Sequence, residues 1–222
     1  MLTLYHYPLC AKSRLTRVLL GEMNVSFNLK KLDYWKEKSK LLAISPVGEI
    51  PAIITASNRV IVSLYSIIEY LLDLSPESHL LPSSIEERAE MRRIIYWINT
   101  RFDQEVTSYI INEKLLKLMQ STGSPRTEFI RAAKVNFGHH ANYFYNLSNA
   151  SGNLASSHIS VADIFLACHV SVLDYFGEVN WDNLPWLKEW YAPIKSRPSF
   201  RAILADRISI ITPPNYYEDP DF

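Results

Sequence analysis

Cys10 is the residue of this chain best suited to nucleophilic chemistry. It lies at the expected start of a helix, where the positive end of the helix dipole favours a thiolate. A thiol that is merely tolerated at a helix start is the alternative interpretation. Position 13 is serine, so there is no Cys-x-x-Cys pair and dithiol redox chemistry is not expected. Cys168, the other cysteine, falls in a nearly apolar segment and is expected to be an inert packing residue.

The elements that would position Cys10 follow from the hydrophobic pattern of the first 75 residues. A strand-like run stops at Pro8, which cannot donate a hydrogen bond to a sheet. Apolar residues then recur at helical spacing before strand-like alternation returns, which predicts a βαβ unit with a parallel sheet. The predicted order is strand, helix, strand, mixed segment, two-strand hairpin and closing helix, over residues 2–6, 13–22, 26–32, 33–45, 52–62 and 64–74.

The rest of the chain predicts helices. A long and bent helix is expected after Ser84, a second helix begins with Pro125, and residues 149–157 form a polar loop. Ser160 and Asp163 form a capping box at the start of an almost wholly apolar core helix. The predicted divisions are an N-terminal α/β domain, a linker with two prolines, an all-helical domain and an extended tail, over residues 1–75, 76–84, 85–207 and 208–222.

The order βαβαββα, with a proline directly before the hairpin, resembles the N-terminal half of the cytosolic glutathione transferases. The resemblance is carried by residues 4–10, 13–14, 46–51 and 68–71. It implies a thioredoxin-like N-terminal domain followed by an all-α domain. It also implies a cis Ile50–Pro51 bond, which would let the Ile50 backbone pair with a glutathione-like ligand. A cis proline kept for folding alone is the alternative.

The same resemblance implies an acid followed by serine at the end of the last strand, where they hold the γ-glutamyl group of glutathione. This chain has Ser63 and Leu64 there. Ser63 is able to cap the next helix, but it has no negative charge, and Leu64 cannot donate to a carboxylate. Losing a charge-assisted contact costs about 1.5–3 kcal/mol, so glutathione is expected to bind weakly at most. The predicted pocket remnant, with no firmly assigned catalytic residue and no cofactor, consists of Cys10, Ile50, Pro51 and Ser63.

The composition argues against several other classes of protein. The 222 residues include 23 basic and 23 acidic side chains, so no net charge draws the chain to nucleic acid or anionic lipid. No apolar run is long enough to cross a bilayer and no secretory signal is visible, so a cytoplasmic location is expected. His139 and His140 diverge by about 100° on a helix, so they are not expected to share a metal ion.

The C-terminal half carries a narrower resemblance, to the transferase-like, FtsZ-binding division proteins of some bacteria. It rests on residues 171–179, 190–201, 204–207 and the Pro-rich and aromatic ending 212–222. The resemblance implies a homodimer that binds FtsZ filaments, promotes their curvature and bundling, and supports constriction without known glutathione chemistry. Recruitment to the division site is implied as well.

Several residues are candidates for protein contacts. The tail offers Tyr216, Tyr217, Asp221 and Phe222, held extended by neighbouring prolines, as anchors for a partner. A tail that packs back on its own domain is an equal alternative. Trp35 is a further candidate, because tryptophan is enriched at interfaces, with core or lid packing as its alternative.

Three functional hypotheses follow. The leading one is a non-enzymatic protein that binds FtsZ. The second is a glutathione transferase or glutathione-dependent peroxidase that uses Cys10. The third is a structural transferase-like subunit with another partner.

Overall fold

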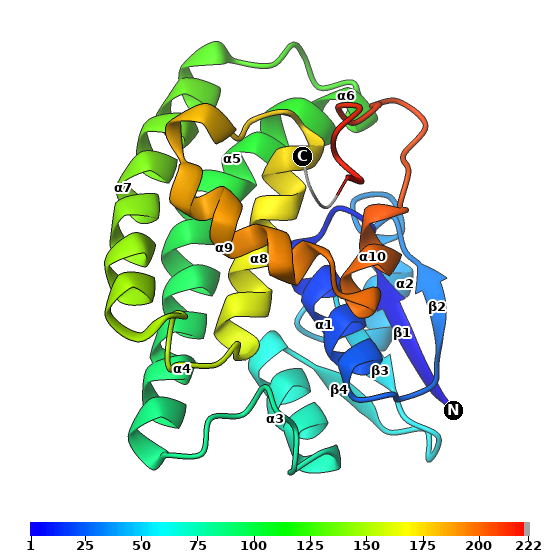
Figure 1. The fold of residues 1–222 in the computed structure, drawn as a ribbon. Helices are drawn as coiled ribbons and strands as arrows, with labels where there is room; N and C mark the ends of the chain where they lie inside the picture. The colour runs from blue at the N-terminus through cyan, green and yellow to red at the C-terminus, as the bar shows by residue number, and fades with distance from the viewer. Residues whose placement is uncertain (220–222) are drawn as a thin grey trace.

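The computed structural model describes residues 1–219 of the chain. A four-stranded sheet with its helices forms one half, and a larger all-helical region forms the other (Figure 1). The expected combination of a thioredoxin-like N-terminal domain and an all-α C-terminal domain is confirmed.

The sheet contains the strands β1 (Leu2–His6), β2 (Phe27–Lys31), β3 (Ala52–Ile54) and β4 (Val60–Val62). Their order is β2-β1-β3-β4, with β1 and β2 parallel and the other two pairings antiparallel. Leu4 of β1 pairs with Ile53 of β3, and both side chains are fully buried, so this pair lies in the core.

Three helices accompany the sheet: α1 (Ala11–Glu22), α2 (Lys38–Ile44) and α3 (Leu64–Leu74). The predicted βαβαββα order is therefore confirmed, with α1 beginning two residues earlier than expected. The predicted apolar stripe of α3 is buried, as Leu64, Ile67, Ile68, Leu71 and Leu72.

A long helical stretch follows the linker. It comprises α4 (Ile85–Trp97), η1 (Ile98–Thr107), α5 (Ser108–Ile111), η2 (Asn112–Leu116) and α6 (Lys117–Gln120), with η1 and η2 in π-helical geometry. The Ser84 side chain accepts a hydrogen bond from the Glu87 N–H at 3.1 Å, as the predicted cap requires. The hydrophobic period predicted the long helix but gave no sign of its π-helical turns.

The remaining elements are α7 (Thr127–Ser151), α8 (Val161–Tyr175), η3 (Trp181–Asn183), α9 (Pro185–Lys195) and α10 (Pro198–Leu204). Two predicted boundaries were wrong, because α7 begins after Pro125 and continues to Ser151. Every residue of α8 is buried, and its capping box is present, with Asp163 Oδ2 accepting from the Ser160 N–H at 2.9 Å. Since α1 contacts both α8 and α10, it links the sheet to the helical region.

Candidate functional site

The segments of the predicted pocket remnant meet at one end of the sheet. Ala52, the first residue of β3, pairs with Tyr5 near the end of β1 and with Val62 at the end of β4. The strand ends therefore lie side by side. Three pocket residues stand next to these strand ends: Cys10 follows β1, Pro51 precedes β3 and Ser63 follows β4.

The backbone of this pocket has the geometry that the transferase resemblance implies. The Ile50–Pro51 bond is cis, which confirms the prediction. Ser63 has φ 71° and ψ 133°, a combination that residues other than glycine rarely adopt. Its side chain makes no capping hydrogen bond, so the predicted role of Ser63 as a helix cap is wrong. A capping side chain reaches the first turn from extended backbone with negative φ, which Ser63 does not have.

The side chains at this position do not supply the chemistry that a transferase pocket needs. Ser63 carries no charge, and Leu64 is only 5% exposed because it belongs to the buried stripe of α3. Ile50 is also buried, at 7% exposure. The pairing of the Ile50 backbone with a glutathione-like ligand, and the weakness of that binding, stay predictions.

Cys10 is partly buried and packs against the hydrophobic core. Burial raises the pKa of its thiol, while the hydrogen bond with Ser13 and the charge of Lys12 oppose this rise only in part. The expectation of a favoured thiolate is therefore wrong here, because burial disfavours the charged form of the thiol. A neutral thiol at pH 7 is a weak nucleophile, and this weakens the case for Cys10 as a catalytic residue.

Trp35 lies in an aromatic cluster beside the pocket. Its ring meets the ring of Tyr7 at 4.8 Å and that of Tyr34 at 4.9 Å, both edge to face. The side chain is partly buried and packs against the core. Packing within the protein therefore explains most of the position of the Trp35 side chain. Because part of the side chain is exposed, its contact with a partner stays a prediction.

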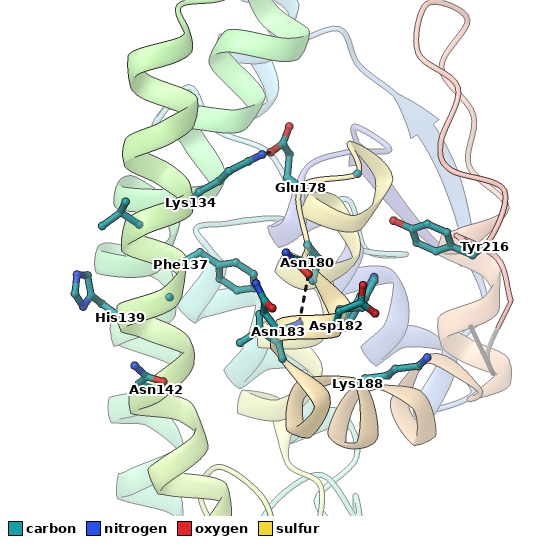
Figure 2. Close-up of a pocket in the computed structure, with 16 residues that line it drawn as sticks. Lys134, Phe137, His139, Asn142, Glu178, Asn180, Asp182, Asn183, Lys188 and Tyr216 are labelled. Atoms are coloured by element: carbon teal, nitrogen blue, oxygen red, sulfur yellow. Dashed lines mark hydrogen bonds and ion pairs between the residues drawn. The ribbon is translucent and has the colours of Figure 1, made fainter.

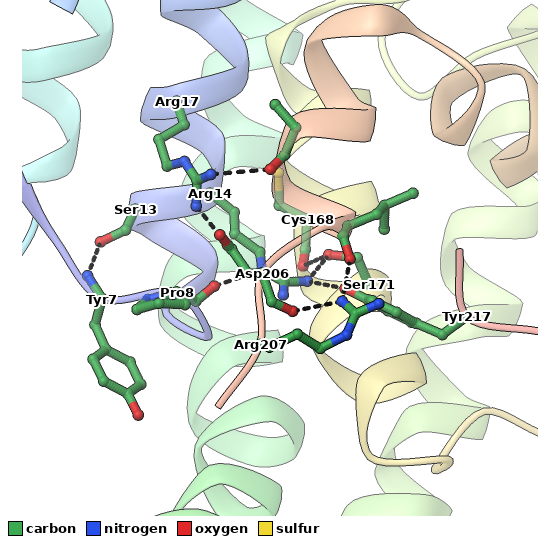
Figure 3. Close-up of polar contacts among 12 residues, drawn as sticks. Tyr7, Pro8, Ser13, Arg14, Arg17, Cys168, Ser171, Asp206, Arg207 and Tyr217 are labelled. Atoms are coloured by element: carbon green, nitrogen blue, oxygen red, sulfur yellow. Dashed lines mark hydrogen bonds and ion pairs between the residues drawn. The ribbon is translucent and has the colours of Figure 1, made fainter. Parts of the chain in front are cut away.

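A second polar site joins the tail to the rest of the molecule, and it is built on Arg14 of α1 (Figure 3). The Arg14 side chain is fully buried. Its Nε donates to the Pro8 carbonyl oxygen at 2.8 Å, and its Nη1 donates to Ser171 Oγ at 2.7 Å and to the Tyr217 hydroxyl at 2.9 Å. One guanidinium thus holds the sheet domain, α8 and the tail together; we call these four residues the tail clamp.

Further contacts fasten the chain before it reaches the clamp. The Tyr175 hydroxyl accepts from the Ile208 N–H at 3.2 Å and donates to the Ile211 carbonyl oxygen at 2.9 Å. Arg17 pairs with Asp206 at 2.5 Å. The tail therefore follows a fixed path over α8 before it reaches the clamp.

The clamp decides between the two interpretations for Tyr217 alone. Tyr217 is fully buried, and its ring meets that of Tyr175 at 5.2 Å, so Tyr217 packs on its own chain and offers no surface to a partner. Tyr216 is 37% exposed. The two other predicted contact residues, Asp221 and Phe222, lie outside the described residues.

A buried ion pair lies under the same segment. Asp174 of α8 and Lys195 of α9 are both fully buried, with 4.0 Å between carboxylate oxygen and Nζ. Burial raises the pKa of Asp174 to about 6 and lowers that of Lys195 to about 8. Asp174 Oδ1 accepts from Trp181 Nε1 at 2.9 Å, and Lys195 Nζ donates to the Tyr216 carbonyl oxygen at 3.4 Å. The pair thus ties η3 and the tail to the core.

The two adjacent histidines of α7 diverge as predicted. His140 is buried, and its Nδ1 accepts from Trp97 Nε1 at 3.1 Å, whereas His139 is exposed. Within residues 1–219, no group of three or more histidine, cysteine or acidic side chains is arranged to hold a metal ion.

Comparisons with known proteins agree with this geometry. The family model for the glutathione S-transferase N-terminal domain matches residues 4–79. A crystal structure of a glutathione S-transferase from Rhodospirillum rubrum is 39% identical and superimposes with a TM-score of 0.94, covering 100% of both chains. These matches define the class as a glutathione-transferase-like protein.

The full-length matches are more specific. FtsZ-localized protein A of Caulobacter vibrioides is 35% identical over 223 residues, covering 99% of this chain and 98% of the relative. The structure of FzlA from C. crescentus superimposes with a TM-score of 0.95 at 36% identity, covering 100% of this chain and 99% of that one. The chain belongs to the transferase-like family that contains FtsZ-localized protein A.

Proposed function

We propose that the protein is a non-enzymatic cell-division protein that binds FtsZ filaments and promotes their curvature and bundling during constriction. The observation that carries this proposal is the similarity to FtsZ-localized protein A, which extends over 99% of the chain. This similarity includes the clamped tail, whereas the transferase family model matches no residue beyond 79.

The pocket remnant supports the non-enzymatic part of the proposal. Its backbone is that of a transferase, yet Ser63 and Leu64 cannot meet the charged groups of glutathione. The raised pKa of Cys10 adds a second obstacle to catalysis. No cofactor is therefore part of the proposal, and any residual glutathione binding is weak.

The test is co-sedimentation with FtsZ of Caulobacter vibrioides assembled with GTP, followed by electron microscopy of the filaments. We expect the protein to enter the pellet only with assembled FtsZ and to increase filament curvature. An unchanged pellet and straight filaments would overturn the proposal. Replacing the candidate contact Tyr216 by alanine should reduce pelleting if the tail contributes, whereas Tyr145→Ala, on α7 and 42% exposed, is the matched control.

A homodimer is part of the same proposal. Large apolar side chains are exposed around β4, α3 and α4, near the ion pair of Arg92 with Glu69. They are Val60, Tyr65, Ile85 and Tyr96. Exposed apolar side chains of this size are typical of interfaces, and a two-fold dimer would bury them against its own copy. Light scattering of the wild type and of Tyr96→Glu tests this, with a shift to monomer expected in the variant.

The proposed location is the cytoplasm, with recruitment to the division site, where residues of the tail could contact other division proteins. No helix within residues 1–219 is long and apolar enough to span a membrane. Fluorescence microscopy of a tagged copy beside FtsZ tests the location.

A second candidate function is a glutathione transferase or peroxidase that uses Cys10. It is favoured by the retained cis Ile50–Pro51 bond and by the 39% identity to the Rhodospirillum rubrum enzyme. Calorimetric titration with glutathione separates the two functions, because a dissociation constant below about 1 mM would contradict the argument from Ser63 and Leu64.

A further inference from the structure

A cleft of about 1090 Å³ lies in the helical region, away from the pocket remnant. None of the residues that line it belongs to the sheet or its helices. Figure 2 shows Phe137 pointing from α7 toward the turn that carries Asn180, Asp182 and Asn183, with Tyr216 of the tail on the other side. The cleft is therefore built from α7, the η3 turn, α9 and the clamped tail.

One lining residue, Gly138, is a glycine although packing within the protein does not require one at this position. It lies inside the 25-residue helix α7, where glycine is less favourable than alanine. A Cβ built at Gly138 would meet nothing within 4 Å. The helix therefore gains no internal contact from glycine here, and the missing side chain opens the backbone to whatever enters the cleft.

Apolar and aromatic side chains form part of the lining, beside its polar and charged residues. Phe137 and Val179 are each only 6% exposed and form part of the core. Trp181 is held in place, because its ring stacks on Tyr191 with centroids 5.6 Å apart and planes 8° apart. The rings of Phe137 and Trp181 lie beside the uncovered backbone of α7 at Gly138. Such a surface suits a ligand with a flat ring system better than a ligand with a flexible chain.

The charged side chains of the lining, two of each sign, do not favour a strongly charged ligand. Glu178 pairs with Lys134 at 2.8 Å, so these two charges of the lining offset each other; Glu178 also pairs with Lys114, which lies outside the lining. The other two charged residues in the lining, Asp182 and Lys188, have opposite signs. A polyanion or a dicarboxylate would therefore meet no net complementary charge.

Carboxamides provide the polar groups of the lining. Asn142, Asn180 and Asn183 come from both walls of the cleft, and Asn180 Oδ1 accepts from the Asn183 N–H at 3.3 Å, which fixes the turn. A carboxamide presents donor and acceptor in one plane and pairs with the edge of a heteroaromatic ring.

We propose that this cleft is a binding site for an uncharged, planar heteroaromatic molecule that lies against α7 at Gly138 and is hydrogen-bonded at its edge by the asparagines. The site is separate from the pocket beside Cys10 and does not depend on FtsZ binding. The tail completes it, since Tyr216 forms one wall.

The test is an NMR titration of the full chain with three uncharged probes, adenosine, guanosine and lumiflavin. At least one probe is expected to shift the amide signals of Gly138 and Asn183 and the indole signal of Trp181 saturably, with a dissociation constant below about 1 mM. Adenosine monophosphate is the charged match for adenosine and is expected to bind at least three times more weakly.

Variants make the test specific to the cleft. Gly138→Trp fills the open space and is expected to weaken binding at least tenfold, whereas Asn146→Trp, at an exposed position of the same helix outside the lining, leaves it unchanged. Thermal unfolding checks that both variants fold. Binding would be overturned by the absence of saturable shifts with all three probes, or by equal affinity of Gly138→Trp and wild type. Tighter binding of adenosine monophosphate would overturn the uncharged class.

Discussion

The pocket remnant and the tail clamp are both places where distant segments meet, yet they differ in what each has retained. In the pocket remnant, the backbone keeps a cis Ile50–Pro51 bond and an unusual Ser63, while the side chains that would hold a charged ligand are missing. In the tail clamp, the side chains make a dense set of buried polar contacts around Arg14.

The difference indicates that the specific side-chain interactions of this chain are concentrated at the tail clamp and not at the pocket remnant. A buried guanidinium that loses a hydrogen-bond partner is left with an unpaired charged donor, so each partner of Arg14 contributes to stability. The pocket has no comparable requirement, since Ser63 and Leu64 leave no buried charge behind. A pocket without its charged anchor and a tightly held tail fit the proposed role in protein contacts, and each prediction below tests one side of this comparison.

Arg14→Ala should have the largest effect. It removes three hydrogen bonds of a buried charged group, each worth about 1.5 kcal/mol or more, so the free energy of unfolding should fall by roughly 4–6 kcal/mol. Urea denaturation measures the change. Arg14→Lys keeps the charge without the planar fork and should lose about half as much, which gives a usable value if the alanine variant does not fold.

The control is Arg101→Ala, whose side chain is 62% exposed in its pair with Glu105 and should cost less than about 1 kcal/mol. Equal losses for the Arg14 and Arg101 variants would contradict the importance of the clamp.

Lys195→Met should have the next largest effect, because it leaves Asp174 buried without its ion-pair partner. Breaking a buried pair in this way costs about 3–5 kcal/mol, whereas replacing both members is close to neutral. The double variant Asp174→Asn with Lys195→Met should therefore recover most of the loss, because the new carboxamide oxygen still accepts from Trp181. Chemical denaturation of the two single variants and the double variant measures the coupling.

The same pair predicts a pH dependence. The pKa of Asp174 is raised to about 6, above its value of 3.8 in the unfolded chain, so the folded state holds this proton more tightly. Its contribution to stability is present below about pH 4 and is lost as the pH rises to 6. Stability curves of wild type and Asp174→Asn over this range should diverge; parallel curves would rule out a raised pKa at Asp174.

Restoring the anchor tests whether the pocket backbone is still competent. Ser63→Glu with Leu64→Ser returns the acid and the hydroxyl, and glutathione affinity should rise by about 10- to 100-fold, corresponding to about 1.5–3 kcal/mol. Calorimetry measures the affinity, and Leu64→Ser alone controls for the loss of its buried side chain. An unchanged affinity would show that the missing acid and hydroxyl are not what limits glutathione binding.

Tyr217→Phe should have a smaller effect on the clamp than loss of Arg14. It removes only the hydroxyl that accepts from Arg14, at a cost of about 1.5 kcal/mol, and keeps the ring against Tyr175. Limited proteolysis should cut the tail several times faster than in wild type. Tyr216→Phe, at a partly exposed ring, is the matched control and should leave the rate unchanged.

Local patterns predicted most of the fold. The apolar stripe of α3, the capping box of Ser160 and Asp163, and the burial of α8 each depend on residues a few positions apart. The π-helical turns were not predicted, because the hydrophobic period of this stretch is that of an ordinary helix and does not distinguish the two geometries.

The sites were harder to predict than the fold. Arg14 was recognised only as part of a family motif, because its partners Ser171 and Tyr217 lie 157 and 203 positions away. The sequence did offer one signal of a buried arginine. Arg14 lies four residues before the apolar Val18, on the same face of the helix. At Cys10 the start of a helix was visible in the sequence, while the burial that raises the pKa of the thiol depends on segments that meet only in the folded chain.

Ser63→Gly should have the smallest effect and the opposite sign. At φ 71° and ψ 133° a residue with a Cβ is strained by about 1 kcal/mol or more, and glycine removes that strain. Glycine also makes the unfolded chain more flexible, which offsets part of the gain, so an increase of about 0.5–1 kcal/mol in the free energy of unfolding is expected. Thermal and urea denaturation measure it, with Ser57→Gly, an exposed residue of the β3–β4 turn, as the control. If Ser63→Gly is more stable and still binds FtsZ like wild type, the strained backbone serves no present function. If FtsZ binding falls while stability rises, the strain belongs to the partner surface, and the pocket remnant and the tail clamp then serve the same function.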